Sequence, residues 1–334
     1  MNIREQIEAK EYQELSPYAA RSQDSKGRKR VELECDIRTI YQRDRDRILH
    51  SKAFRRLKDK TQVFLAPQGD HYRTRLTHTL EVSQTARTIA KALSLNADLV
   101  EAIALGHDLG HTPFGHAGEV ALNNMSENGF THFEQSVRVV EVLEKNGAGL
   151  NLSWEVLDGI LNHQMSTLPA TLEGQVVRLC DKISYMHHDM DDAERAGIIT
   201  EDDIPITIRM VIGGSTRERL NALIHDIITN SYNKDKIMMS KEVEEAMNAL
   251  REIMFAQVYK SSIAKKEEVK AKRMLSELYR YYYDHPELMT TEYQALISNG
   301  EILERVVCDY ISGMTDQYSI DKFEEIFVPL GWSL

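Results

Sequence analysis

The stretch GHDLGHTPFGHAGE, residues 106–119, gathers three histidines and two carboxylates among small residues. The adjacent side chains of His107 and Asp108 can reach one metal ion, and imidazole with carboxylate suits a divalent transition ion. Two later histidines, His111 and His116, supply groups that bind phosphate or transfer protons. The glycines between them let backbone and side chains approach a bound anion closely. The stretch therefore predicts the core of a metal-dependent site for hydrolysing phosphate esters.

The His-Asp dipeptide is not decisive by itself, because it occurs three times, at residues 107–108, 188–189 and 225–226. Around the last pair, apolar residues recur at helical spacing and leave both polar members off the apolar stripe. Because charged side chains are rarely buried, we interpret that pair as a solvated helix face. The metal prediction therefore depends on the residues that surround the first pair.

The composition is that of an ordinary globular protein, with 334 residues, 42% hydrophobic and 28% charged. The net charge of −11 argues against general affinity for nucleic acid or for an anionic membrane. The three cysteines are far apart and show no metal-ligand spacing, which favours a reducing compartment. No signal peptide or apolar run of membrane-spanning length is apparent. We therefore expect a cytoplasmic protein without a membrane partner.

Helical periodicity dominates the chain, and alternating patterns typical of strands are few. The basic stretch at residues 21–30 is expected to be a mobile N-terminal segment, and residues 65–72 a loop. Asp98 is expected to cap the N-terminus of its helix. Helices are predicted over residues 32–57, 78–93, 98–107, 133–143, 156–163 and 173–192, and long helices over 216–283.

The predicted fold is all-α, a helical bundle with a C-terminal helical extension. We expect three parts: a helical and substrate-binding segment at residues 1–73, a core at 74–195, and a helical region at 196–334 packed on that core. No internal repeat or low-complexity linker separates them.

A four-ligand metal site needs residues beyond His107 and Asp108, and two candidates lie on inner helix faces. His78 begins an apolar stripe, where a histidine is more often a hydrogen-bonded core residue than a ligand. Asp181 shares a helix face with apolar neighbours, and a buried carboxylate is costly unless it is paired or binds a metal. Each signal is weak alone. Together they supply two imidazoles and two carboxylates from three helices.

The order of these residues, His, His-Asp and Asp, resembles the HD superfamily of metal-dependent phosphohydrolases. More narrowly, the chain resembles the deoxyguanosinetriphosphate triphosphohydrolase-like (dNTP triphosphohydrolase) family. The resemblance covers roughly residues 16–195, where the motifs occur in family order. The matching stretches are residues 16–19, 54–57, 60–64, 73–78, 107–119 and 181–192.

The resemblance implies the HD-domain helical bundle and hydrolysis of a deoxynucleoside triphosphate (dNTP), of dGTP or of several dNTPs. Cleavage between the 5′ oxygen and the α-phosphorus would release deoxynucleoside and intact tripolyphosphate. The family also implies one divalent ion per subunit, which could be Mn, Mg, Fe, Co, Ni or Zn. Relatives are generally homo-oligomers, often hexamers, and some respond to a dNTP effector. A single-stranded nucleic acid is a further possible effector.

The resemblance assigns roles to individual residues. The metal ligands would be His78, His107, Asp108 and Asp181, and the catalytic groups His116, Glu119, His111 and His132. The substrate-binding residues would be Arg55, Gln62, Arg75, Lys182, Tyr185 and Asp189.

Simpler interpretations remain open for three of these residues. Glu119 lies three residues after His116, so the pair would share a helix face, but its charge could merely favour a helix N-terminus. His132 could be an ordinary loop residue, and Arg55 could lie on a solvated face.

Two other functions remain open as well. The chain could be an HD phosphohydrolase acting on nucleoside monophosphates or cyclic nucleotides, although the basic residues around 55–75 favour a longer phosphate chain. It could instead be a non-catalytic nucleotide sensor or nucleic-acid-binding module. Its acidic charge and its 7% aromatic residues argue against the latter.

Overall fold

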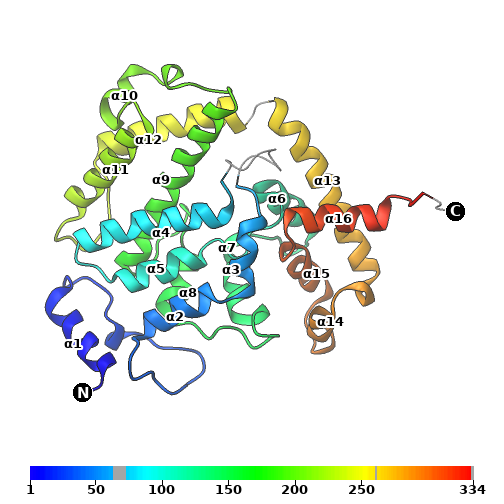
Figure 1. Cartoon of the computed structure of the whole chain (residues 1–334), viewed down its shortest axis with the longest axis horizontal. Coiled ribbons are helices and arrows are strands. Elements are labelled where there is room, and N and C mark those ends of the chain that lie inside the picture. Colours follow the sequence, from blue (N-terminus) through cyan, green and yellow to red (C-terminus); the bar gives the residue numbers. More distant parts are fainter. Residues whose placement is uncertain (63–72, 260–261, 332–334) are drawn as a thin grey trace.

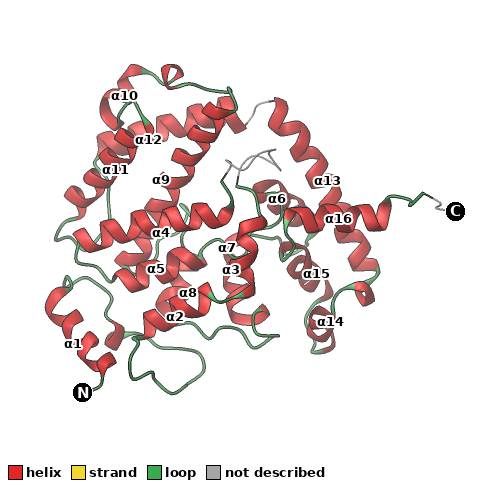
Figure 2. Ribbon diagram, viewed as in Figure 1, coloured by secondary structure: helices red, strands yellow, loops and turns green. Residues whose placement is uncertain are grey.

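The computed structural model describes residues 1–62, 73–259 and 262–331, and its regular elements there are helices (Figure 1). Figure 2 shows helices joined by loops, without a strand in the described part. The all-α prediction is therefore confirmed. The helices are α1 (Ile3–Glu14), α2 (Ile40–Leu49), α3 (Lys52–Arg56), α4 (Arg75–Ala92), α5 (Ala97–Gly106), α6 (Gly115–Met125), α7 (His132–Arg138), α8 (Trp154–Leu161), α9 (Leu172–Arg195), α10 (Ile206–Ile212), α11 (Thr216–Ser231), α12 (Lys241–Met254), α13 (Ser262–Asp284), α14 (Thr291–Ser298), α15 (Leu303–Ser312) and α16 (Asp316–Phe327).

The larger of two hydrophobic cores forms around α5, which contacts α2, α4, α8 and α9. This helix is apolar almost all round, and a helix of that kind must be covered on every side. The smaller core lies where α6 meets α13, and α15 packs against α13 (Figure 1). Residues 107–114 connect α5 to α6 and therefore pass from one core to the other. The histidine-rich stretch lies at this junction.

The prediction of a mobile segment at residues 21–30 is wrong, because polar contacts anchor it. The carboxylate of Glu155 accepts hydrogen bonds from Ser25 Oγ and from the Lys26 amide, each at 2.7 Å. Arg28 forms an ion pair with the buried Asp44. The segment is therefore packed against the rest of the protein and does not form a free arm.

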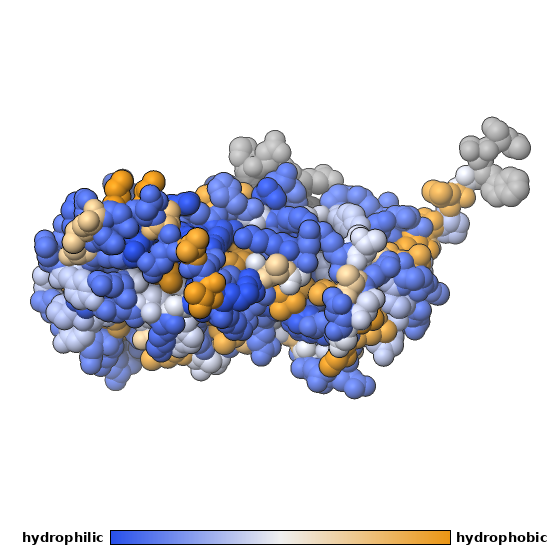
Figure 3. Space-filling model, turned by 90° about the horizontal axis from the view of Figure 1, so that it is seen from below, coloured by the Kyte–Doolittle hydropathy of each residue, from blue (hydrophilic) through white to orange (hydrophobic). Residues whose placement is uncertain are grey.

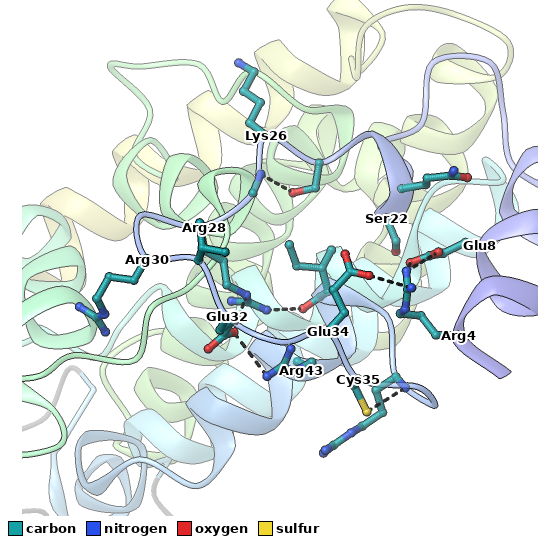
Figure 4. Close-up of a pocket in the computed structure, with 16 residues that line it drawn as sticks. Arg4, Glu8, Ser22, Lys26, Arg28, Arg30, Glu32, Glu34, Cys35 and Arg43 are labelled. Carbon is teal, nitrogen blue, oxygen red and sulfur yellow. Dashed lines mark hydrogen bonds and ion pairs between the residues drawn. The ribbon is translucent and has the colours of Figure 1, made fainter. Parts of the chain in front are cut away.

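A neighbouring cavity of about 340 Å³ is lined by arginines and glutamates among other residues. Figure 4 shows several of these side chains facing one another. Arg4 forms ion pairs with Glu8 and Glu34, and Glu32 forms ion pairs with Arg28 and Arg43. Opposite charges therefore pair with one another along this cavity.

Several element boundaries differ from the sequence prediction. Residues 32–57 form two short helices, α2 and α3, after an extended stretch. The N-cap of α5 is Asn96, whose side chain accepts from the Leu99 amide at 3.2 Å, so the prediction of Asp98 is wrong. Asp98 instead pairs with Arg45. The region 216–283 breaks after α11, and α12 ends in a π-helical turn. The predicted loop at residues 65–72 lies outside the described residues.

The surface in Figure 3 is mainly hydrophilic, with hydrophobic residues in small separate groups. Among the residues that the structure describes, no helix is both long and apolar enough to cross a membrane.

Candidate metal centre and active site

The four residues predicted to bind metal converge at one point. His78 comes from α4, His107 and Asp108 from the end of α5, and Asp181 from α9. The Nε2 atoms of His78 and His107 lie 3.1 Å and 3.6 Å from Asp181 Oδ1. Asp108 places one oxygen 3.4 Å from His107 Nε2 and the other 4.0 Å from His78 Nε2. The ligand atoms of His78, His107 and Asp108 lie close enough together to hold one ion, and Asp181 borders the two histidines.

His107 gives independent support for a cation at this point. Its Nδ1 lies 2.7 Å from the Ala104 carbonyl oxygen, so Nδ1 carries the proton and leaves the Nε2 lone pair facing the cluster. That Nε2 atom is buried without a hydrogen-bond partner. Burial alone would lower the pKa of His107, but Asp108 and Asp181 raise it to about 9, so these carboxylates favour either a proton or a metal ion on Nε2. The site therefore attracts positive charge, as the donor set of a divalent ion does.

A second layer behind His78 was not found from the sequence. His78 Nδ1 lies 3.4 Å from His188 Nδ1, and His188 Nε2 lies 2.7 Å from Glu81. Such outer partners fix the orientation of a ligating imidazole. In the sequence, the second His-Asp dipeptide, at residues 188–189, could have indicated that His188 lies near the predicted metal site.

The predicted pair His116 and Glu119 is in contact at the start of α6. His116 Nδ1 lies 3.2 Å from Glu119 Oε2, while the other carboxylate oxygen accepts from both the ring Nδ1 and the amide of His132, each at 2.9 Å. Burial would raise the pKa of Glu119, but these histidines hold it well below its usual value. The hydrogen bond to Glu119 in turn raises the pKa of His116. His116 is 87% exposed and can meet a substrate.

His111 connects the two clusters. Its Nε2 lies 3.2 Å from Asp108 Oδ1, and its ring stacks on that of His132 with centroids 4.0 Å apart. Burial lowers the pKa of His111 well below its usual value. Asp108, a predicted metal ligand, and Glu119 are thus joined through two stacked imidazoles.

One cavity of about 960 Å³ opens onto both clusters. Arg75 lines it and donates to Asp108 Oδ2 at 3.0 Å. Gly115 lies against this arginine with φ +55°, and a Cβ there would come within 2.8 Å of Arg75 Nη2 and 3.0 Å of the Gln62 carbonyl oxygen. The other predicted residues along the cavity are Gln62, His78, Asp108, His111, His116, His132, Asp181, Tyr185 and Asp189.

Two predicted substrate-binding residues are not among those that line the cavity. Arg55 is exposed on α3, and Lys182 Nζ donates to Asn248 at 3.0 Å. The end of α12 and the turn after it supply Arg251, Glu252 and Phe255 to the cavity instead. No motif in the C-terminal third of the sequence indicated these residues.

The turn between the two cores is held by a distant carboxylate. Phe114, at the N-cap of α6, has the left-handed φ of 59°, and Asp316 at the start of α16 accepts from its amide at 3.0 Å. The other Asp316 oxygen accepts from the Thr61 amide at 3.0 Å and from its hydroxyl at 2.6 Å. Asp316 therefore fixes the backbone that carries His116.

Comparison with known proteins agrees with this geometry. The HD domain model matches residues 75–186, and the phosphohydrolase-associated domain model matches residues 237–325. A protein of Caldanaerobacter subterraneus named deoxyguanosinetriphosphate triphosphohydrolase-like protein is 57% identical over 334 residues, covering 99% of this chain and 98% of its own. The chain belongs to the deoxyguanosinetriphosphate triphosphohydrolase-like family. A family member from Clostridium perfringens is 51% identical and covers 98% of each chain.

Solved structures show the same fold at lower identity. A phosphohydrolase from Bacteroides thetaiotaomicron aligns with a TM-score of 0.53 and 18% identity, over 84% of this chain and 67% of its own. A hypothetical protein from Aquifex aeolicus aligns with a TM-score of 0.51 and 21% identity, over 85% of this chain and 71% of its own. Membership of the family and the HD domain make this chain a metal-dependent phosphohydrolase.

Proposed function

We propose that the protein hydrolyses dNTPs to deoxynucleoside and tripolyphosphate. The observation that carries this proposal is that the four-residue metal cluster and the Glu119 cluster face one cavity and are linked through His111. Hydrolysis at phosphorus needs charge neutralisation and a proton donor for the leaving oxygen at one place. The names of the relatives support a deoxynucleotide, and dGTP in particular.

Different residues along the cavity would have different roles in the reaction. His78, His107, Asp108 and Asp181 would hold a divalent ion, which when bound polarises phosphoryl oxygen and lowers the pKa of water. His111 and His132 would lie beside the α-phosphate, and His116 would protonate the leaving 5′ oxygen. Arg75 and Arg251, which α12 supplies to the cavity, would bind the outer phosphates, since a guanidinium group can form two hydrogen bonds to one phosphate (bidentate binding).

The sugar would lie against α9. Tyr185 and Asp189 are one helical turn apart on this helix, and both line the cavity. A tyrosine ring under the sugar leaves little room for a 2′ hydroxyl, while the Asp189 carboxylate can accept from the 3′ hydroxyl. Ribonucleotides should therefore be poor substrates.

Further features of the proposal come from the family resemblance: one divalent ion per subunit, a homo-oligomer such as a hexamer, and a dNTP or single-stranded nucleic-acid effector. We also propose a cytoplasmic location, which the widely spaced cysteines support. The division of the chain at residues 73/74 and 195/196 is likewise a proposal.

A product assay tests the proposed reaction. The purified protein is incubated with each dNTP, and in parallel with nucleoside monophosphates and cyclic nucleotides. Each incubation contains Mn²⁺, Mg²⁺, Co²⁺, Ni²⁺, Fe²⁺ or Zn²⁺, and the products are separated by ion exchange. Deoxynucleoside and intact tripolyphosphate are expected, and ¹⁸O from labelled water should enter the tripolyphosphate. Pyrophosphate as the main product would contradict the placement of the α-phosphate. Exclusive turnover of monophosphates or cyclic nucleotides would favour the alternative HD activity.

A further inference from the structure

Lys60 is a buried basic residue that the proposed reaction does not yet use. It belongs to the basic residues around 55–75 from which the sequence predicted phosphate binding. The structure places it after the short helical turn that follows α3, where it is 2% exposed, and it is not among the residues that line the cavity. Because a buried amine without partners is costly, Lys60 must be satisfied by other groups of the protein.

The side chain of Lys60 joins two segments that lie far apart in the sequence. Its Nζ donates to the carbonyl oxygen of Ser312, at 2.8 Å, and to the carbonyl oxygen of His111. Ser312 is the last residue of α15, where the final carbonyls lack partners within the helix and favour a nearby cation. Burial lowers the pKa of Lys60 to about 7, but the ammonium and the neutral amine both have enough N–H groups for two carbonyls.

The backbone of Lys60 is fixed as well. Its carbonyl oxygen accepts from the amide of Arg75, the first residue of α4, at 3.0 Å. Lys60 is therefore held at the start of α4 and reaches from there to the turn after α5 and to the end of α15.

The turn that carries His111 is held at two successive residues. Ser136 of α7 accepts from the Gly110 amide at 2.9 Å, and Lys60 holds the turn one residue later, at the His111 carbonyl. The orientation of that peptide group helps to set the His111 ring, which stacks on that of His132 with centroids 4.0 Å apart. Without Lys60 this carbonyl would lose its partner in a buried place, and the peptide group would turn towards another donor.

We propose that Lys60 is a positioning residue, which aligns His111 with the reacting phosphate by tying the His111 carbonyl to the C-terminal end of α15. This inference rests on the proposed function for the role of His111. It also gives α15 an influence on the reaction, although no residue of that helix is among those that line the cavity.

A simpler role for Lys60 is to stabilise the fold without affecting the reaction. Arg28 offers a matched control, because its side chain is 6% exposed, pairs with Asp44 and does not line the cavity. Lys60→Met and Arg28→Met each remove a buried basic group, so both should lower the stability towards urea. Only Lys60→Met should change the reaction.

The test measures kcat, KM and metal content for these two variants and for the milder Lys60→Gln. Lys60→Met should lower kcat about 100-fold, the effect of displacing a catalytic group by about 1 Å, with KM within about twofold and metal content unchanged. The amide of Lys60→Gln keeps one donor, so this variant should fold even if Lys60→Met does not, and should lose about tenfold in kcat. Arg28→Met should keep the kcat of the parent. In a His111→Ala background, Lys60→Met should cause no further loss of kcat.

A second measurement does not depend on turnover. In ¹H–¹³C spectra of Zn²⁺-loaded protein with labelled histidines, the signal of the His111 ring, assigned through His111→Ala, is sensitive to the stacked His132 ring. It should move in both Lys60 variants and stay in place in Arg28→Met.

Parent-like kcat in the Lys60 variants, a further loss of kcat in the His111→Ala background, or an unmoved His111 signal would overturn the proposal. If the parent protein does not hydrolyse dNTPs but the His111 signal moves in the Lys60 variants alone, only the proposed function is refuted.

Discussion

Gly115→Ala tests how closely the cavity is built around Arg75. An alanine at φ +55° adopts the left-handed region, which costs roughly 1–2 kcal/mol in the free energy of folding. Its Cβ would also meet Arg75 Nη2 at 2.8 Å and the Gln62 carbonyl oxygen at 3.0 Å. Arg75 is 3% exposed, so it can yield only by moving into the cavity and away from Asp108.

Gly197→Ala is the matched control, because Gly197 has φ +67° and nothing within 4 Å of its Cβ position. We expect the control to lose only the roughly 1–2 kcal/mol of backbone strain and to keep its KM. Gly115→Ala should lose about 1 kcal/mol more of folding stability than the control, because its Cβ crowds a backbone oxygen. Its KM for dNTP should rise about tenfold, because Arg75 loses one charge-assisted contact with the substrate.

Chemical unfolding and steady-state kinetics on both variants measure the two effects. Equal stability losses together with equal KM values would refute the argument that Gly115 sets the position of Arg75.

Three further predictions concern the metal cluster, the proton-transfer pair and the wall supplied by α12. Asp108→Ala should lower bound metal well below one ion per chain while the helical circular-dichroism spectrum persists; full metal content would contradict the ligand assignment. Glu119→Gln should keep metal and dNTP binding but lower kcat by about 10²- to 10⁴-fold. Glu119 raises the pKa of His116, so a reaction that needs protonated His116 should lose kcat as the pH rises through that pKa. In Glu119→Gln the decline of kcat should begin at a lower pH. Identical pH profiles for the parent and the variant would exclude this coupling. Arg251→Ala should raise KM for dNTP about tenfold with a smaller change in kcat, and an unchanged KM would remove Arg251 from phosphate binding.

Local spacing predicted the parts of the site that single helices create. The three-residue spacing of His116 and Glu119 produced the contact that the structure shows. His78 and Asp181 converge with His107 because each lies on the inner face of its helix, which apolar periodicity reveals.

Prediction from the sequence was poorer where two neighbouring residues could both play the same structural role, and where a contact joins segments that lie far apart in the sequence. Asn96 and Asp98 are both good N-caps, and the backbone geometry selected Asn96. Lys182 follows a metal ligand in the sequence, but successive residues on a helix point in different directions, and its ammonium meets Asn248 instead. Arg251 lines the cavity, and α15 contacts Lys60, only through packing of elements that lie far apart in the sequence, so no local pattern marks them.

Because Asp316 lies near the end of the chain, the ribosome synthesises it after the other residues of the site, and this order has a consequence for activity. It is made long after the predicted metal ligands, yet it holds the Phe114 amide at the turn that leads into α6 and the amide of Thr61, which precedes α4 in the sequence. A nascent chain that has not yet emerged as far as α16 would carry its metal ligands but would lack the clamp that sets His116. Catalytic competence should therefore appear late in translation, after α16 has left the ribosome and docked.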